Sequence, residues 1–201
     1  MNIGTLLLAA GGSTRLGGEL KQLLPCANRP LVRYVAEIAL SVGDGPVVVV
    51  LGAHRERVQA ALTDLSLRLV YNADWTTGLA SSLKAGLLAL PLAELEAVLI
   101  LLTDQPYVTT TLLDDLIATR RQTGRGIVAS AYAGQVGVPA LFDKRYVDEL
   151  LALEGDMGAK SLIGRHSADC ADVPFPLGAV DLDTQQDVLN WRTPSDPCKD
   201  G

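Results

Sequence analysis

The sequence predicts an α/β protein built on a doubly wound, mostly parallel sheet with helices on both faces. Short apolar runs rich in valine, leucine and isoleucine alternate with segments of helical periodicity, the order expected of βαβ units. The runs are apolar at nearly every position, as are strands that are covered on both faces. Of the 201 residues, 48% are hydrophobic and only 4% aromatic, which suits aliphatic layers packed closely on a sheet.

Each element follows from its local pattern. The predicted strands are Ile3–Ala9, Val47–Leu51, Leu67–Tyr71, Val98–Leu102 and Ile127–Ala131. The predicted helices are Leu31–Leu40, Arg55–Leu62, Leu79–Leu90, Thr110–Gln122 and a last one from near Thr184 to about Trp191. Pro30 suits the start of the first helix. After Ala131, glycines and prolines break the chain into short elements, which we interpret as a substrate-facing lobe on the same sheet.

Length and composition limit the organisation and the partners. We expect a single domain over residues 1–192 and a disordered, polar tail over 193–201. The formal net charge is −6 and no run of lysines and arginines is present, so nucleic acid is not an expected partner. No segment is long enough to span a membrane. An odd number of cysteines without metal-ligand spacing favours a reducing compartment, so we expect a cytoplasmic protein.

A glycine-rich loop follows the first strand, within LLLAAGGSTRLGG at 6–18. Gly11 and Gly12 allow backbone N–H groups to approach phosphate oxygens closely. Arg15 and Lys21 add positive charge to an otherwise acidic chain, and Lys21 suits the α-phosphate and a departing pyrophosphate. The loop is not a Walker A loop, because no Gly-Lys-Ser/Thr follows Gly17, and its glycine spacing is not that of a dinucleotide fingerprint. The alternative is an ordinary strand-to-helix turn.

Carboxylates follow the fourth strand and precede the last helix. In a parallel sheet, ligands bind beyond the carboxyl ends of the strands, which is where Asp104 stands. A carboxylate there can bind Mg²⁺ together with water and phosphate. Asp181 and Asp183 are candidates for a second metal ligand. The alternatives are a helix-capping or turn role for Asp104 and a helix-capping role for Asp183.

The third predicted helix carries two serines in its first turn. Ser81 and Ser82 lie in its first turn, where N–H groups and hydroxyls are free for a ligand, although plain capping would explain them as well. His54 and His166 lack metal-ligand partners, and Cys26 has no visible activator, so we expect none of the three to do chemistry.

Several of these motifs resemble one family. Lys21-Gln22-Leu23-Leu24-Pro25, followed by Arg29-Pro30-Leu31, resembles the signature of the MobA-like nucleotidyltransferases, and the resemblance extends to about Trp191. It implies a Rossmann-like core of the nucleotide-diphospho-sugar transferase type. Ala9-Ala10-Gly11 and Asp104-Gln105-Pro106 resemble the molybdenum cofactor cytidylyltransferase (MocA) branch more than the guanylyl branch.

The resemblance also implies roles for individual residues. It makes Arg15, Lys21 and Asp104 catalytic, and Asp104 with Asp183, or else Asp181, the metal ligands. The implied nucleotide contacts are Ala9, Ala10, Gly11, Gly12, Asn72, Gly78 and Ser82. The implied acceptor contacts are Gly137, Pro139, Gly155 and Asp156. Relatives often carry histidine where this chain has Val138.

The expected function is Mg²⁺-dependent transfer of CMP from CTP to the phosphorylated pterin of the molybdenum cofactor, with release of pyrophosphate. A molybdoenzyme or its chaperone is an expected further partner. GTP as donor, or a sugar or polyol phosphate as acceptor, remains open. Two other classes are also open: a nucleotide-binding module without catalysis, and an oxidoreductase.

Overall fold

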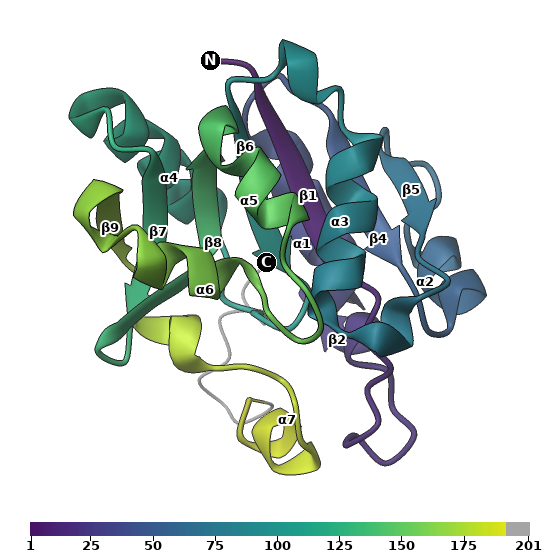
Figure 1. Ribbon diagram of the computed structural model, residues 1–201. Helices are drawn as coiled ribbons and strands as arrows, with labels where there is room; N and C mark the ends of the chain where they lie inside the picture. The colour runs from purple at the N-terminus through teal and green to yellow at the C-terminus, as the bar shows by residue number, and fades with distance from the viewer. Residues whose placement is uncertain (192–201) are drawn as a thin grey trace.

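The computed structural model describes residues 1–191, so the predicted tail at 193–201 lies outside them. A seven-stranded sheet runs in the order β5-β4-β1-β6-β8-β7-β9 (Figure 1). The strands are β1 (Ile3–Ala9), β4 (Val47–Leu51), β5 (Arg68–Tyr71), β6 (Ala97–Leu102), β7 (Ile127–Tyr132), β8 (Gln135–Asp143) and β9 (Cys170–Pro174). A separate two-stranded ribbon pairs β2 (Pro25–Cys26) with β3 (Arg29–Pro30).

The prediction of a mostly parallel, doubly wound sheet is confirmed. β5, β4, β1 and β6 pair in parallel, β7 and β9 pair in parallel, and β8 is antiparallel to both of its neighbours. The five predicted strands and five predicted helices each match an observed element to within one residue at either end. Their apolar patterns were therefore sufficient to locate them.

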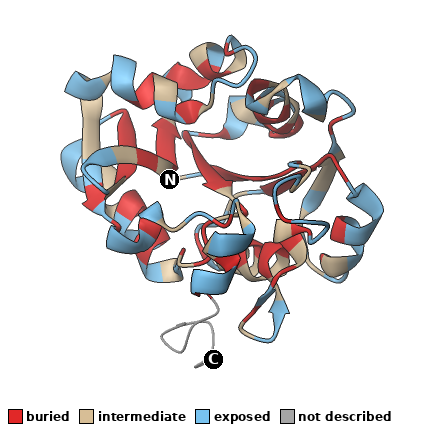
Figure 2. Cartoon of the chain, turned by 90° about the horizontal axis from the view of Figure 1, so that it is seen from below, coloured by how far each residue is buried: buried red, intermediate tan, exposed pale blue. Residues whose placement is uncertain are grey.

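The helices form two layers, one on each face of the sheet (Figures 1 and 2). They are α1 (Leu31–Ser41), α2 (Arg55–Ala61), α3 (Leu79–Ala89), α4 (Thr110–Thr123), α5 (Val147–Leu151), α6 (Ala159–Arg165) and α7 (Gln185–Trp191). Side chains alternate along β1, so that Leu7 packs in the core with α1, α2, α4 and α7. Leu6 and Leu8 pack in the core with α3, α5 and α6.

Strand β8 is the main element that the sequence did not predict. The glycines and the proline of this stretch were interpreted as breaks, yet residues 135–143 form the longest strand of the sheet. The register with β7 shifts between Ala129 and Ser130, so Val138 and Pro139 lie in a bulge. A proline at a bulge removes no regular ladder bond, which is why the strand tolerates it.

The topology creates one switch point. From β1 the chain crosses to β4 and β5 on one side, then returns to β6 on the other side of β1. Connections therefore diverge at the carboxyl ends of β1 and β6 and leave a crevice there.

No helix among residues 1–191 is long and apolar enough to cross a membrane. Of the described cysteines, Cys170 is a free thiol and Cys26 is disulfide-bonded, which the argument from an odd cysteine count did not anticipate.

Candidate active site

The glycine-rich loop leaves β1 at the switch point. Its backbone N–H groups at residues 11–15 donate to no acceptor among the described residues, whereas the next one, that of Leu16, bonds the carbonyl of Ser13. Consecutive backbone donors without acceptors form a concave site for an anion. The loop therefore offers the free N–H donors that the predicted phosphate site requires.

A buried glutamine holds this loop in shape. Gln22 is 1% exposed, and its amide nitrogen donates to the carbonyl oxygens of Ala9 at 3.2 Å and Gly11 at 2.6 Å. The Ser13 hydroxyl donates to the Gln22 oxygen and accepts from the Lys21 amide. The carbonyl oxygens of Ala9 and Gly11 therefore accept from Gln22, while the backbone N–H groups of residues 11–15 remain available to a ligand. Sequence reasoning missed Gln22, because nothing local marks a glutamine as buried.

Lys21 is the charge centre of the site. Its Nζ lies 2.7 Å from Oδ2 of Asp104 and 2.9 Å from Oδ1 of Asp183. Burial alone would lower the pKa of Lys21, but the two carboxylates outweigh it and raise that pKa above its ordinary value. Lys21 is therefore a cation at neutral pH. Arg15 is largely exposed and lies 4.0 Å from Asp183, so it can turn toward a ligand at low cost.

Asp104 has a free oxygen suited to a metal ion. Its Oδ2 bonds Lys21, while its Oδ1 is buried and has no hydrogen-bond partner. No group of three metal-ligating side chains occurs among the described residues. Mg²⁺ nevertheless needs only one or two carboxylates, since water and substrate phosphates supply its other ligands. Asp104 with Asp183 fits that requirement.

The segment before α7 carries the other two carboxylates. The amide of Leu182 donates to the carbonyl oxygen of Asp104 and ties this segment to the end of β6. Thr184 and Asp187 cap α7 through reciprocal bonds, so Asp183 does not act as the cap and can reach Lys21. Partial burial, together with the charges of Asp104 and Asp183, raises the pKa of Asp181 to about 6 although its side chain is still solvent-accessible.

The start of α3 forms the opposite wall. Asn72 is buried, and its amide donates to the hydroxyls of Ser81 and Ser82 at 2.9 and 3.0 Å. Asn72 therefore joins β5 to α3 and does not line the cavity. Ser82 does line it, as does Gly78. Trp75 packs its ring against Gly12, and a side chain at position 12 would crowd it.

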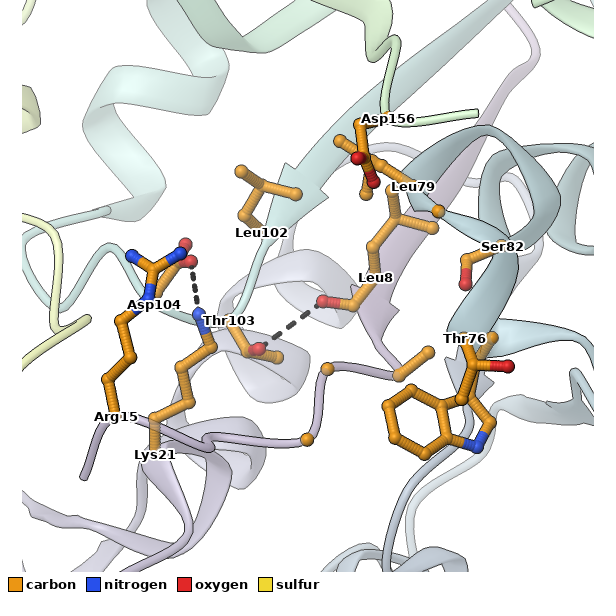
Figure 3. A pocket seen from close by; sticks show the side chains of 15 residues that line it. Leu8, Arg15, Lys21, Thr76, Leu79, Ser82, Leu102, Thr103, Asp104 and Asp156 are labelled. Carbon is orange, nitrogen blue, oxygen red and sulfur yellow. Dashed lines mark hydrogen bonds and ion pairs between the residues drawn. The ribbon is translucent and has the colours of Figure 1, made fainter. Parts of the chain in front are cut away.

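These elements enclose a cavity of about 460 Å³ (Figure 3). Figure 3 shows Arg15, Lys21 and Asp104 along one side and Ser82 and Thr76 along another. The predicted site residues that line it are Ala10, Gly11, Gly12, Arg15, Lys21, Gly78, Ser82, Asp104 and Asp156. Ala9 lies beneath the loop, almost fully buried. Sequence reasoning did not select Leu8, Thr76, Leu79, Leu102 and Thr103, which also line the cavity.

The predicted acceptor residues lie on two segments. Gly137 pairs with Ser130 just before the bulge of β8 and Pro139 lies in the bulge; a side chain at 137 would overlap the Tyr132 hydroxyl. Gly155 and Asp156 lie in the loop before α6, which packs on the start of α3 through a bond from the Ala80 amide to the Gly155 carbonyl. Of these four residues, Asp156 lines the cavity.

We expect Gly78→Ala to destabilise the protein and to raise the KM for nucleotide. Gly78 has a φ of +119°, and a Cβ there would overlap the backbone of Gly155 and Asp156. The backbone strain alone costs about 1–3 kcal/mol. Thermal unfolding and initial rates measure the two effects. Gly43→Ala is the control, since Gly43 also has a positive φ but open space around it. Equal losses in both variants would contradict the overlap.

With this geometry established, comparison with known proteins places the chain in a family. A family model described as the MobA-like NTP transferase domain matches residues 5–170. The chain belongs to this family. The resemblance predicted from the loop motifs is therefore confirmed, and the chain is a nucleotidyltransferase of the MobA-like type by family.

Individual relatives of this MobA-like chain span nearly its whole length. Nicotine blue oxidoreductase from Paenarthrobacter nicotinovorans is 34% identical over 193 residues, which cover 91% of this chain and 93% of the relative. The crystal structure of Rv0371c from Mycobacterium tuberculosis H37Rv has a TM-score of 0.82 at 29% identity, covering 94% of this chain and 96% of that one. Its complex with manganese has a TM-score of 0.78 at 26% identity and covers 94% and 97%.

Proposed function

We propose that this protein transfers CMP from CTP, with Mg²⁺, to the phosphorylated pterin of the molybdenum cofactor and releases pyrophosphate. One observation carries the proposal: Lys21 lies between Asp104 and Asp183, beside a loop whose N–H groups at residues 11–15 have no acceptor within residues 1–191. Such an arrangement suits phosphoryl transfer, which depends on positioning and charge neutralisation more than on covalent catalysis.

In the proposed reaction, the position of each residue in the site determines its role. The amides of residues 11–15 bind the triphosphate, and Arg15 folds over its outer end. Lys21 leaves Asp183 to contact the α-phosphate and the leaving pyrophosphate, whose negative charge grows as the bond breaks. Asp104 and Asp183 would hold the metal ion, which would supply positive charge to neutralise the transferred group. The acceptor phosphate attacks from the side of Asp156.

CTP is proposed as the donor nucleotide because of two motifs, one at the start of the glycine-rich loop and one directly after β6. Ala9-Ala10-Gly11 and Asp104-Gln105-Pro106 are typical of the cytidylyl branch. The manganese complex of Rv0371c supports the use of a divalent ion by proteins of this shape. Mg²⁺ suits Asp104 best, because it is a hard cation that prefers carboxylate and phosphate oxygens.

Transfer of label tests the acceptor. CTP labelled at the α-phosphate, incubated with enzyme, Mg²⁺ and the phosphorylated pterin, is expected to give a labelled dinucleotide, and none in EDTA. Ribose 5-phosphate in place of the pterin is expected to give no labelled product. Label on ribose 5-phosphate and none on the pterin would contradict the pterin assignment while leaving the transferase reaction intact.

A second candidate function comes from the 34% identical relative, which is named as an oxidoreductase. The same cavity could then hold a nicotinamide nucleotide, with the amides of residues 11–15 on its phosphates. NADH or NADPH oxidation in the presence of a dye acceptor, without any nucleoside triphosphate, measures this activity. Oxidation unaffected by removal of divalent ions, with no pyrophosphate from any nucleotide, would favour the redox function over the transferase.

A further inference from the structure

A second cavity, of about 670 Å³, adjoins the 460 Å³ cavity of the candidate active site. The turn from β4 into α2, residues 52–57, forms most of its wall, and Tyr71 at the end of β5 forms another part. Gly12 and Trp75 line both cavities, so the glycine-rich loop borders each of them. The lysine and the carboxylates of the proposed transfer site do not line the second cavity. It therefore lies beside that site and has its own chemistry.

The charged side chains of this lining are mostly basic. Arg55 and Arg57 supply two guanidinium groups and His54 an imidazole, while Glu56 supplies the one carboxylate. Six other arginines among residues 1–191 form ion pairs with carboxylates, whereas neither Arg55 nor Arg57 does. Two arginines without a counter-charge, facing one cavity of a chain with net charge −6, indicate a site for an anion.

An aromatic contact orients one of these arginines. The guanidinium carbon of Arg55 lies 4.6 Å from the centroid of the Tyr71 ring. A guanidinium stacked on a ring keeps the N–H groups at its edge free, and these match two oxygens of a phosphate group. The Tyr71 side chain is 49% exposed, so a ligand in solvent can reach the stacked pair. Because Arg55 is already oriented, less side-chain entropy is lost when an oxyanion binds.

The glycine-rich loop connects this cavity to the triphosphate site. Gly12 and Thr14 line the second cavity, and they also line a small pocket of about 160 Å³ whose other walls include Arg15 and Lys21. The backbone N–H groups of residues 12 and 14 donate to no acceptor within residues 1–191. An oxyanion that moves from Lys21 toward Arg55 can therefore keep hydrogen bonds to the loop on its way.

We propose that the second cavity binds the pyrophosphate that leaves the donor nucleotide, at a site separate from the triphosphate site. The proposal rests on the proposed function, since that reaction is the source of the pyrophosphate. Two guanidinium groups suit a compact anion of high charge. The carboxylates of Asp104 and Asp183 are absent from this lining, so they repel pyrophosphate less there than beside Lys21. The phosphates of a second nucleotide offer the same oxyanions, so the experiment has to separate the two sources.

Equilibrium dialysis of labelled inorganic pyrophosphate, in EDTA and without nucleotide, tests the proposal without turnover. We expect the double variant Arg55→Ala/Arg57→Ala to bind pyrophosphate about tenfold more weakly or worse, because two charge-assisted contacts are lost. Both side chains are exposed, so the fold should be kept, which thermal unfolding checks. Arg121→Ala is the matched control: Arg121 is an exposed arginine on α4 that lines neither cavity, and its variant should bind as the wild type does.

Two further arms identify the site and the source. Arg15→Ala should retain pyrophosphate binding, since Arg15 lines the triphosphate site and not the second cavity. Labelled CTP is expected to bind at a single site per chain in the wild type and in Arg55→Ala/Arg57→Ala alike. Two CTP sites, one of them lost in the double variant, would assign the cavity to a second nucleotide and overturn the proposal.

The proposal is also overturned if pyrophosphate does not bind, if the double variant and Arg121→Ala bind it equally, or if Arg15→Ala alone loses it. Pyrophosphate release from CTP with Mg²⁺ and the phosphorylated pterin is measured separately on the same preparations. Binding that depends on Arg55 and Arg57, with no release from any nucleotide, would refute the transferase reaction and leave the oxyanion site. Release in the wild type, with binding that does not depend on these arginines, would refute the second site alone.

Discussion

Asp104→Asn is expected to reduce kcat on the order of a thousandfold, the largest effect of any single substitution considered. Asparagine keeps the shape of the side chain but removes the negative charge and replaces one of the two carboxylate oxygens by an NH₂ group, so the side chain can no longer both face Lys21 and bind a metal ion as a carboxylate. Initial rates of pyrophosphate release over a range of Mg²⁺ concentrations measure the loss. High Mg²⁺ should restore part of the rate, since a weakened metal site can be filled by mass action.

Asp114→Asn is the control for this variant. Asp114 is an exposed carboxylate on α4 and does not line the cavity that Asp104 lines, so the same change of charge should leave kcat within about twofold. Circular dichroism should show both variants folded. An Asp104→Asn enzyme that retains the wild-type rate at low Mg²⁺ would refute the metal role of Asp104.

Lys21→Ala is expected to lower kcat about a hundredfold or more and to raise the KM for CTP as well. Lys21 is the cation between the carboxylates of Asp104 and Asp183, and no other lysine among the described residues lines the same cavity. Its loss removes the charge that meets the leaving pyrophosphate. Steady-state kinetics separate the two parameters.

Lys84→Ala provides the comparison, because Lys84 is exposed on α3 and does not line the cavity that Lys21 lines. That variant should match the wild type in both parameters. A Lys21→Ala enzyme with a raised KM and an unchanged kcat would show that Lys21 binds the ground state only, which would contradict its role in the transfer step.

The sequence predicted the parts of the site that follow strands. Asp104 and the glycine loop were selected because ligands bind beyond the carboxyl ends of parallel strands, and both line the cavity that the structure shows there. Lys21 was selected as a basic residue beside glycines in an acidic chain. Each of these residues is recognised from its neighbours in the chain, so a single sequence is enough to select it.

The parts that depend on distant segments were missed or misplaced. Gln22 acts through the carbonyls of Ala9 and Gly11, and this requires the curvature of the folded loop. Asn72 was predicted to bind nucleotide, whereas its amide is engaged by two serine hydroxyls of α3. β8 was missed because a bulge, which no local pattern reveals, accommodates its proline.

Pyrophosphate release is to be measured with CTP, GTP, ATP and UTP in turn, with phosphorylated pterin and Mg²⁺ present. If the glycine-rich loop and Lys21 bind a triphosphate whose α-phosphate is transferred, release is fastest with CTP and depends on both the pterin and the metal ion. A preference for GTP would contradict the cytidylyl assignment, and no release with any of the four nucleotides would contradict the transferase itself.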